Sequence, residues 1–250
     1  MSAQRKRKPQ PTGSSVSLVL GLGEVGRPLL EVLSQAHRVE GIDLPARDIE
    51  GPVTFMHVGY PGEIADFVGT TAAYAARYRP RYVVIHSTVP LGTTRRVQER
   101  VTVPVVHSPV RGKHVRMAQE LVSYVKFLGC EDDAAAAAVE EHFQQVGMRT
   151  RRLPCPEATE LAKLTETTYF GVLIAFVQDV DRMARAAGVA YEDIASFYEE
   201  IGYLPRVRFF PGVIRGHCVM SNIKLLQQTF SSRLLDAVEW SNELRRAEGA

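Results

Sequence analysis

The sequence predicts an α/β protein with a doubly wound parallel sheet, followed by an all-helical domain with one long central helix. From Ser15 to Leu153, short apolar runs alternate with segments of helical spacing. That alternation is typical of a mostly parallel sheet with right-handed crossovers. Pro154 and Pro156 interrupt the alternation, and beyond them the pattern is almost entirely helical. We therefore predict one domain over residues 15–153 and a second over 154–250.

Length and composition narrow the class of protein. The chain has 250 residues, of which 45% are hydrophobic and 23% charged, so it is predicted to be globular. Its 30 basic and 28 acidic residues give no electrostatic argument for nucleic-acid binding. No run reaches the roughly 18 apolar residues of a membrane span. Three cysteines and no recognisable export signal predict a reducing, cytoplasmic location. The basic residues 1–14 are predicted to be a disordered tail.

Apolar runs bounded by turn residues predict the strands of the first domain. We expect strands within residues 16–23, 38–44, 53–58, 81–89, 103–109, 123–130 and, as a final edge strand, 148–153. Helical spacing predicts helices over residues 24–36, 63–78, 93–101 and 132–146. Asp132 and Asp133 open the last of these helices, where the helix dipole favours negative charge.

The second domain is predicted to contain a long helix from Glu157 to about Gly188. A shorter helix is expected over Asp193–Ile201, a loop over Leu204–Arg215 and a closing helix over Ser221–Arg246. The middle of the long helix, YFGVLIAFV, is apolar nearly all round and must be covered on every side. This small domain cannot wrap it fully, so we expect a homodimer joined along the helix.

A dinucleotide-binding fingerprint follows the first predicted strand and opens a helix. Gly21, Gly23 and Gly26 have the G-x-G-x-x-G spacing, with Glu24 and Val25 between them. The first glycine permits the tight turn, the second admits the pyrophosphate and the third allows close helix–strand packing. The helix N-terminus then faces the phosphates. We therefore predict a Rossmann-type dinucleotide site.

Asp43 ends the second predicted strand, seventeen residues after Gly26. A carboxylate there accepts the ribose hydroxyls and repels a 2′-phosphate, which favours NAD over NADP. Arg47 lies close by in the sequence and keeps NADP open as an alternative.

Four segments, taken in order, resemble the UDP-glucose/GDP-mannose dehydrogenase family. HSTVPLGTT (86–94) resembles its STVPPGTT loop, and HSPVRG (107–112) its Asn/Ser-Pro-Glu segment. ELAKLTETTYFGVLIAFVQDV (160–180) is similar to its central helix, and PGVIRGHCV (211–219) to the loop that carries its catalytic cysteine. The resemblance implies an NAD-binding domain, a dimer-forming long helix, a cysteine nucleophile and a helix lysine.

Several positions depart from the family pattern. Val110 stands where the family has a glutamate that assists thioester hydrolysis, and Thr167 stands where it has an asparagine. Arg215 replaces a glycine, and Met220 replaces a proline. The sequence ends where the family's third domain, which completes the nucleotide site, is expected to begin. These departures leave open both the nucleotide-sugar substrate and the four-electron oxidation.

Cys218 and Lys163 are the catalytic candidates. A thiolate at Cys218 could attack an aldehyde, and hydride transfer to NAD would convert the adduct to a thioester. Neighbouring cations such as Arg215 and His217 would raise its thiolate fraction. Lys163 is a candidate acid/base or electrostatic clamp on a developing alkoxide. Thr167 lies one helical turn further on, hence on the same helix face.

Other polar residues are assigned by their place in the predicted sheet. Ser87 and Thr88 follow a strand, where they would lie over the nicotinamide or cap the next helix. Two basic clusters suggest an anionic substrate, and the alternative for both is a solvated loop. The first cluster comprises Arg111, Lys113, His114 and Arg116. The second comprises Arg206, Arg208 and Arg215, and His217 lies beside it in the sequence. We expect no metal site, since His86 and His107 have no spaced partners. Cys130 and Cys155 are expected to be inert.

Three functions remain open from the sequence. The first is an NAD-dependent oxidoreductase that uses Cys218 and Lys163 on a small, polar, anionic alcohol or aldehyde. The second is a two-electron dehydrogenase of the 3-hydroxyacid type that uses Lys163 alone. The third is a non-catalytic, regulatory NAD-binding protein. The sequence does not name the substrate.

Overall fold

The computed structural model describes residues 15–43, 45–112, 116–202, 210–215 and 217–249, apart from the side chain of His217. These residues divide into two compact units, 1–163 and 164–250. The predicted domain boundary after residue 153 lies a little before this division, and the domain limits stay a prediction. Among the described residues, no helix is both long enough and apolar enough to cross a membrane.

Unit 1 contains a seven-stranded sheet with the order β2-β1-β3-β4-β5-β6-β7. Its strands are β1 (Val16–Leu20), β2 (Val39–Ile42), β3 (Val53–Val58), β4 (Tyr82–Ile85), β5 (Val105–His107), β6 (Lys126–Gly129) and β7 (Thr150–Leu153). All neighbouring pairs are parallel except β5 and β6, which pair antiparallel with His107 opposite Gly129. The α/β prediction is confirmed, and β6 runs against its neighbour β5 within the mostly parallel sheet.

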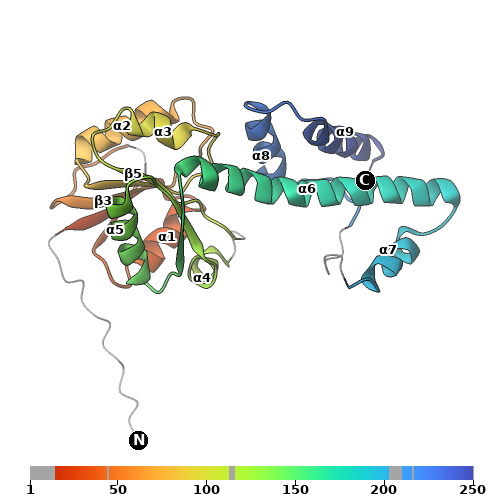
Figure 1. Ribbon diagram of the computed structural model, residues 1–250, viewed down its shortest axis with the longest axis horizontal. Helices are drawn as coiled ribbons and strands as arrows, with labels where there is room; N and C mark the ends of the chain where they lie inside the picture. The colour runs from red at the N-terminus through yellow and green to blue at the C-terminus, as the bar shows by residue number, and fades with distance from the viewer. Residues whose placement is uncertain (1–14, 44, 113–115, 203–209, 216, 250) are drawn as a thin grey trace, which may run out of the picture. The chain divides into compact units, whose positions relative to one another are not determined.

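Helices cover both faces of this sheet (Figure 1). One face carries α2 (Phe67–Tyr78) and α3 (Thr93–Gln98), and the other carries α1 (Gly26–Leu33), α4 (Met117–Ser123) and α5 (Asp133–Gln144). The sequence reasoning missed α4. It also began α2 too early, because the helix starts where Asp66 caps it by accepting a hydrogen bond from Gly69 N–H.

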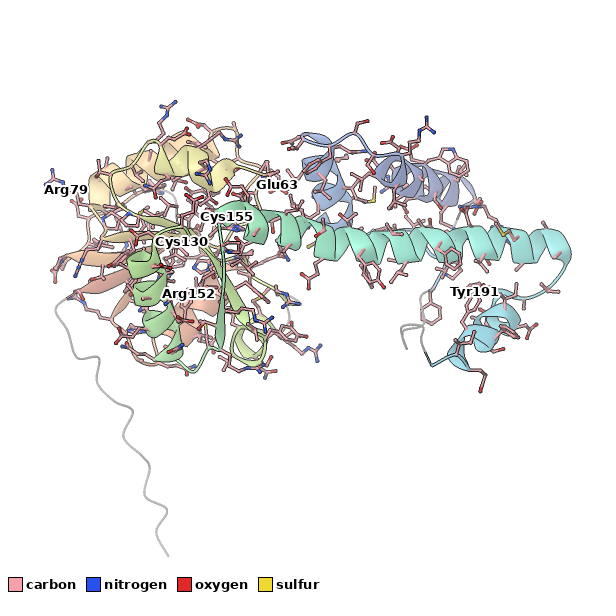
Figure 2. The ribbon with its side chains drawn as sticks, viewed as in Figure 1. Glu63, Arg79, Cys130, Arg152, Cys155 and Tyr191 are labelled. Carbon is pink, nitrogen blue, oxygen red and sulfur yellow. The ribbon has the colours of Figure 1, made fainter. Side chains whose placement is uncertain are left out.

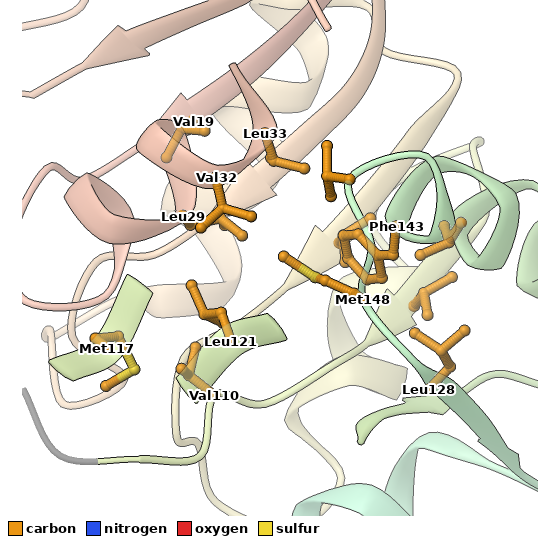
Figure 3. Close-up of a cluster of buried hydrophobic side chains, with 14 of the residues drawn as sticks. Val19, Leu29, Val32, Leu33, Val110, Met117, Leu121, Leu128, Phe143 and Met148 are labelled. Carbon is orange, nitrogen blue, oxygen red and sulfur yellow. The ribbon is translucent and has the colours of Figure 1, made fainter. Parts of the chain in front are cut away.

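The strands are buried on both faces, so two apolar cores form. Alternate residues of each strand point to opposite faces. On β3, Phe55 packs against the α1/α4/α5 side, while Met56 and Val58 belong to the core under α2 and α3. Figure 3 shows the first core, in which Phe143 of α5 and Met148 lie beside β-strand side chains. Both cores anchor the loops at the carboxyl ends of the strands.

Unit 2 is helical and begins within α6 (Pro156–Ala187), a helix of 32 residues. It continues with α7 (Tyr191–Glu199), α8 (His217–Gln227) and α9 (Arg233–Ala247). The predicted single closing helix over Ser221–Arg246 is wrong. The helix stops at Gln227, Phe230 N–H bonds back to the Leu226 carbonyl, and a new helix begins after Ser232.

Candidate active site

The glycine-rich turn lies at the carboxyl end of β1, where the connection to β2 leaves on one side and β3 pairs on the other. Such a switch point is where open α/β sheets bind ligands. Gly21 has φ +82°, and a Cβ added there would lie 2.7 Å from the Tyr60 nitrogen. A Cβ on Gly26 would lie 1.7 Å from the Gly21 carbonyl oxygen. Both positions therefore admit glycine only.

Gly23 differs from the other two, because a Cβ added there meets no atom within 4 Å. Open space at this position suits a ligand that approaches the backbone at the start of α1. Glu24 beside it is exposed and Val25 is half-buried. The turn therefore has the shape that a dinucleotide pyrophosphate needs.

Asp43 lies against this turn, since its Oδ1 accepts a hydrogen bond from Leu22 N–H at 3.1 Å. The carboxylate is exposed and stands at the end of β2. Arg47, the residue that kept NADP open, binds Glu40 at 2.9 Å and the Gly41 carbonyl at 3.2 Å. The arrangement fits a cofactor with free ribose hydroxyls better than one with a 2′-phosphate.

The Ser87 side chain is buried, and it donates to the Tyr60 carbonyl at 2.5 Å. It therefore ties the loop after β4 to the loop after β3. Thr88 beside it is half-buried. The alternative prediction is that these hydroxyls cap the next helix. The structure shows a different N-cap for α3, which is Gly92.

Glu160 of α6 provides the cap of α3 instead. Its carboxylate accepts from Gly92 N–H at 2.6 Å, Thr94 N–H at 2.8 Å and the Thr94 hydroxyl at 2.7 Å. Burial raises its pKa, while these hydrogen bonds act in the opposite direction. Glu160 thus holds the 90–94 loop, which carries part of the family-like segment.

Lys163 and Thr167 lie one turn apart on α6, and both are half-buried. Lys163 is the last residue of unit 1, and its charge contributes to the lowered pKa values of His107 and Lys126, after burial. In unit 2, the Asn222 amide of α8 donates to the Thr167 hydroxyl. Asn222 was not foreseen. It brings an amide to the Thr167 position, where the resemblance leads one to expect an asparagine.

Cys218 is exposed and lies in the first turn of α8 rather than in the predicted glycine-rich loop. Asn222 follows four residues later, hence on the same helix face. Lys163 and Cys218 belong to different units, so their joint site stays a prediction.

The central domain of the UDP-glucose/GDP-mannose dehydrogenase family matches residues 157–244. The UDP-N-acetyl-D-mannosamine dehydrogenase of Pyrococcus horikoshii is 30% identical over 161 residues, covering 59% of this chain and 38% of the relative. The enzyme of the same name from Methanocaldococcus jannaschii is 28% identical over 144 residues, which cover 55% of this chain and 33% of that relative. The chain thus spans about a third of these relatives' length.

Solved structures show the same fold over nearly the whole chain. The UDP-D-ManNAc dehydrogenase structure from Pyrococcus horikoshii gives a TM-score of 0.79 at 21% identity, covering 94% of this chain and 69% of that one. Residues 157–244 thus resemble the central domain of the UDP-glucose/GDP-mannose dehydrogenase family, and the chain as a whole shares the fold of such an enzyme. A 3-hydroxyisobutyrate dehydrogenase from Mycobacterium tuberculosis gives a TM-score of 0.72 at 14% identity. The match covers 92% of this chain and 93% of that one, which shows a shared fold.

Val110, where the dehydrogenase family has a catalytic glutamate, is a core residue. It is 5% exposed and packs with Met117 and Leu121 of α4, as Figure 3 shows. A valine in this environment stabilises the loop after β5 by apolar burial. It offers no carboxylate for hydrolysis of a family-type thioester.

The first basic cluster is partly engaged in protein contacts. The Arg111 guanidinium lies over the rings of Tyr124 and Phe127, at 5.8 and 5.6 Å from their centroids. Arg116 pairs with Glu120 at 3.2 Å. In the second cluster, Arg215 is exposed. Four residues of the two clusters, and the side chain of His217, lie outside the described structure: Lys113, His114, Arg206 and Arg208.

The cysteines expected to be inert lie in unit 1, where Figure 2 labels both Cys130 and Cys155. Each is partly buried, and burial raises the pKa of the Cys130 thiol. Within the described residues, no group of three or more His, Cys, Asp or Glu side chains has the arrangement of a metal site.

Four buried basic residues lie together, and the sequence did not predict that they would meet. His57, His86, His142 and Lys126 are each at most 4% exposed and lie in contact with one another. The available signal was a basic residue inside an otherwise apolar strand, as in VTFMHV and YVKFLG. Sequence spacing could not show that these strands and α5 bring the four together.

Proposed function

We propose that the chain is an NAD-dependent dehydrogenase acting on a polar alcohol or aldehyde, in the manner of the nucleotide-sugar dehydrogenases. The observation that carries the proposal is the glycine turn at the β1/β3 switch point with the Asp43 carboxylate against it. The similarity of residues 157–244 to the central domain of a dehydrogenase family supports the same assignment. The bound cofactor would supply the hydride acceptor.

In this proposal the chain's own residues bind and orient. Gly21, Gly23 and Gly26 form the turn for the pyrophosphate, with Glu24 and Val25 between them, and Asp43 accepts the ribose hydroxyls. Ser87 and Thr88 lie in the loop that follows β4, at the carboxyl edge where the nicotinamide half binds. Lys163 exchanges the alcohol proton, and Cys218 is the nucleophile toward an aldehyde.

We propose an anionic small-molecule substrate, held by the basic residues Arg111, Lys113, Arg215 and His217. The similarity to relatives named as UDP-N-acetyl-D-mannosamine dehydrogenases supports a nucleotide sugar as the first class to test. No nucleic acid or membrane partner enters the proposal. A cytoplasmic location is proposed with it.

Calorimetry with NAD and NADP tests the cofactor directly. We expect NAD to bind and NADP to bind more weakly, because a 2′-phosphate would face the Asp43 carboxylate. Tighter binding of NADP than of NAD would contradict the assignment. Rates of NADH formation, followed by absorbance, are then compared for UDP-N-acetylmannosamine, UDP-glucose and 3-hydroxyacids. The fastest rate identifies the preferred substrate.

The buried Val110 favours a second candidate, a two-electron dehydrogenase of the 3-hydroxyacid type. Without a carboxylate at this position, the chain lacks the family's group for thioester hydrolysis. Lys163 alone would serve that reaction, and Cys218 would be dispensable. The ratio of NADH formed to substrate consumed separates the candidates, since four-electron chemistry gives two NADH and two-electron chemistry gives one.

A further inference from the structure

A row of three histidine rings lies within unit 1, on the sheet face covered by α5. His57 of β3 stands in the middle. Its Nδ1 lies 3.0 Å from Nε2 of His86, which follows β4, and its Nε2 lies 3.2 Å from Nε2 of His142 on α5. The exposed fractions are 0% for His57, 1% for His86 and 4% for His142. Both ring nitrogens of His57 are therefore used in nitrogen–nitrogen hydrogen bonds.

Lys126 continues the row at the carboxyl edge of β4 and β5. Its Nζ lies 3.1 Å from His86 Nδ1, 2.5 Å from the Ser108 carbonyl oxygen and 3.0 Å from the Pro109 carbonyl oxygen. An ammonium group can donate to all three. A neutral amine can donate to the two carbonyls and accept from His86 Nδ1–H. His86 Nδ1 also lies 2.9 Å from the Ser108 carbonyl oxygen, so it can donate there when it is protonated and accept from Lys126 when it is not.

His142 ends the row at the amino edge of the sheet. It lines a cavity of about 350 Å³ between the end of α1, the start of β3 and α5. Charged groups around this cavity are Arg38, Arg81 and Glu141. The His37 ring stacks on His142 with centroids 4.0 Å apart, and His37 Nε2 contacts the His142 carbonyl at 2.9 Å. His142 thus lies between the buried row and a cavity lined in part by charged side chains.

We propose that Lys126, His86, His57 and His142 form a proton relay that joins the loop after β5 to the cavity at the amino edge. The rings contact one another in series, with each nitrogen directed at the next, which suits conduction rather than convergence on one ion. The relay couples opposite edges of the sheet through its interior.

One transfer along the relay balances as follows. The Lys126 Nζ–H bond breaks as His86 Nδ1–H forms, and His86 Nε2–H breaks as His57 Nδ1–H forms. His57 Nε2–H then breaks as His142 Nε2–H forms. The products are a neutral Lys126 amine and a His142 imidazolium, so one proton has crossed with no oxidation or reduction. His142 Nδ1 then loses its proton to the cavity.

Burial lowers the pKa of every member of the row, including His142. Burial, followed by the nearby Lys126 charge, lowers the pKa of His57 to about 3. Burial also lowers the pKa of His86 and of Lys126 well below their ordinary values. The rings are therefore neutral at rest, each with one N–H and one lone pair, and the lysine gives up its proton more readily than an exposed lysine.

The catalytic use of the relay rests on the proposed function, whereas the relay itself does not. Oxidation of an alcohol to a carbonyl releases one proton for each hydride transferred. Lys126 holds the two carbonyls of the loop that follows β5, at the sheet edge where such substrates bind. The relay would carry the released proton to the opposite edge of unit 1.

Nitrogen-15 NMR of the histidine-labelled wild-type protein tests the relay without substrate. We expect couplings through both N–H···N bonds, His57 to His86 and His57 to His142. With Lys126 donating to His86, both His86 and His57 should carry their protons on Nε2. Missing couplings, opposite tautomers in the two rings, or doubly protonated rings at neutral pH would overturn the proposal.

Lys126→Met gives a sharper test, because the methionine keeps the length of the side chain without its donor. His86 Nδ1–H should then donate to the Ser108 carbonyl, and His57, which has no direct bond to Lys126, should switch to the Nδ1–H tautomer. His37→Phe is the matched control, since His37 contacts the carbonyl and ring face of His142 but takes part in neither nitrogen–nitrogen hydrogen bond. It should leave both tautomers as they are. If Lys126→Met does not fold, the wild-type couplings decide alone.

Turnover tests the catalytic use separately. His57→Phe interrupts the relay while keeping an aromatic ring, and we expect its turnover to fall about 10²-fold, as for a lost proton-transfer group. His37→Phe should remain within about twofold of wild type, because His37 touches the ring face and carbonyl of His142 but takes part in neither nitrogen–nitrogen hydrogen bond. Unchanged turnover in His57→Phe would overturn the catalytic use. An inactive wild-type protein with intact couplings would instead reject the proposed dehydrogenase function and leave the relay standing.

Discussion

Asp43 occupies a position where one carboxylate serves both fold and ligand. Its Oδ1 accepts the Leu22 N–H, which fixes the chain just after Gly21, and its exposed face remains available to a ribose. Asp48 lies nearby in the sequence but is exposed and pairs with Arg77 at 2.9 Å. The two aspartates therefore make a matched pair for testing.

Asp43→Ala should weaken NAD binding by about 1.5–3 kcal/mol for each charge-assisted hydrogen bond that the ribose loses. Calorimetry measures the change, and thermal melting checks that the fold is retained. Asp48→Ala should bind NAD like the wild type. Equal weakening in both variants would mean that general charge, rather than a ribose contact, governs binding.

Cys218 and Lys163 are the residues on which the proposed chemistry depends. Cys218→Ser should abolish oxidation of an aldehyde, since a hydroxyl is a far weaker nucleophile than a thiolate. Lys163→Ala should also slow oxidation of the alcohol, by about 10²–10⁴-fold for a lost acid/base. Both rates are followed as NADH absorbance.

Cys130→Ser is the control for these variants, because burial already raises the pKa of that thiol. Its rates should match the wild type. Full aldehyde oxidation by Cys218→Ser would remove the cysteine from the mechanism and favour the 3-hydroxyacid reaction. A structure with the Cys218 sulfur far from Lys163 would favour the regulatory, non-catalytic alternative.

At the scale of elements, the start of α6 stabilises the start of α3. Glu160 is 0% exposed and accepts three hydrogen bonds from Gly92 and Thr94. Helix α3 has no side-chain cap of its own, and its first N–H groups have no partner within the helix. The family-like segment HSTVPLGTT therefore takes its shape from a helix that lies far away in the sequence.

Glu160→Ala should lower the free energy of unfolding of the protein by about 2–4 kcal/mol, because it leaves buried N–H groups without an acceptor. Denaturant unfolding measures the loss. Glu157→Ala, on the same helix, removes a largely solvent-exposed pair with Arg95 and should cost much less. Similar losses for both variants would show that the cap contributes little.

The whole first unit should be sensitive to mild acid because it buries neutral histidines. Burial is the largest cause that lowers the pKa of His57 and of His107 to about 3, and it also lowers those of His86 and His142. In the unfolded chain these rings titrate near 6.5, so below that pH the unfolded state binds more protons. Stability is therefore fully present above pH 6.5 and falls as the pH drops toward 3.

Each such histidine should remove about 1.4 kcal/mol of stability per pH unit over this window. Denaturant unfolding at about pH 6.5 and 5 measures the slope before most carboxylates titrate. His57→Phe should reduce the slope by the share of one histidine. A free energy of unfolding that is flat between these two pH values would contradict the buried, neutral assignment.

Helix α6 presents large apolar side chains that the described part of unit 2 does not cover. Tyr169 is 58% exposed, Phe176 56% and Met183 66%. We predict a homodimer that buries this surface, with more than roughly 2,000 Å² at the interface, as is usual for obligate dimers. Sedimentation at micromolar concentration should show a dimer.

Phe176→Glu should shift the sedimenting species toward the monomer, because it places a charge in the predicted interface. Phe197→Glu is the control, at a side chain that is 71% exposed and belongs to α7 rather than α6. It should leave the dimer intact. A monomeric wild-type protein would refute the predicted interface.

Local features of this protein could be predicted from its sequence. Glycine spacing specified the β1–α1 turn, because Gly21 and Gly26 have no room for a side chain. Apolar periodicity specified the strand β3 at its observed bounds and the long helix α6, because burial of one face or of both faces leaves that signal in the chain. The family resemblance came from the same kind of contiguous segment.

Contacts between residues far apart in the sequence emerged from the folded structure alone. It set β6 antiparallel to β5, divided the last helix at Gln227, and made Glu160 a cap for α3. It also placed three histidines and Lys126 in one hydrogen-bonded row. Sequence spacing could not predict these contacts, because the spacing within one segment does not encode which distant segment it will pack against.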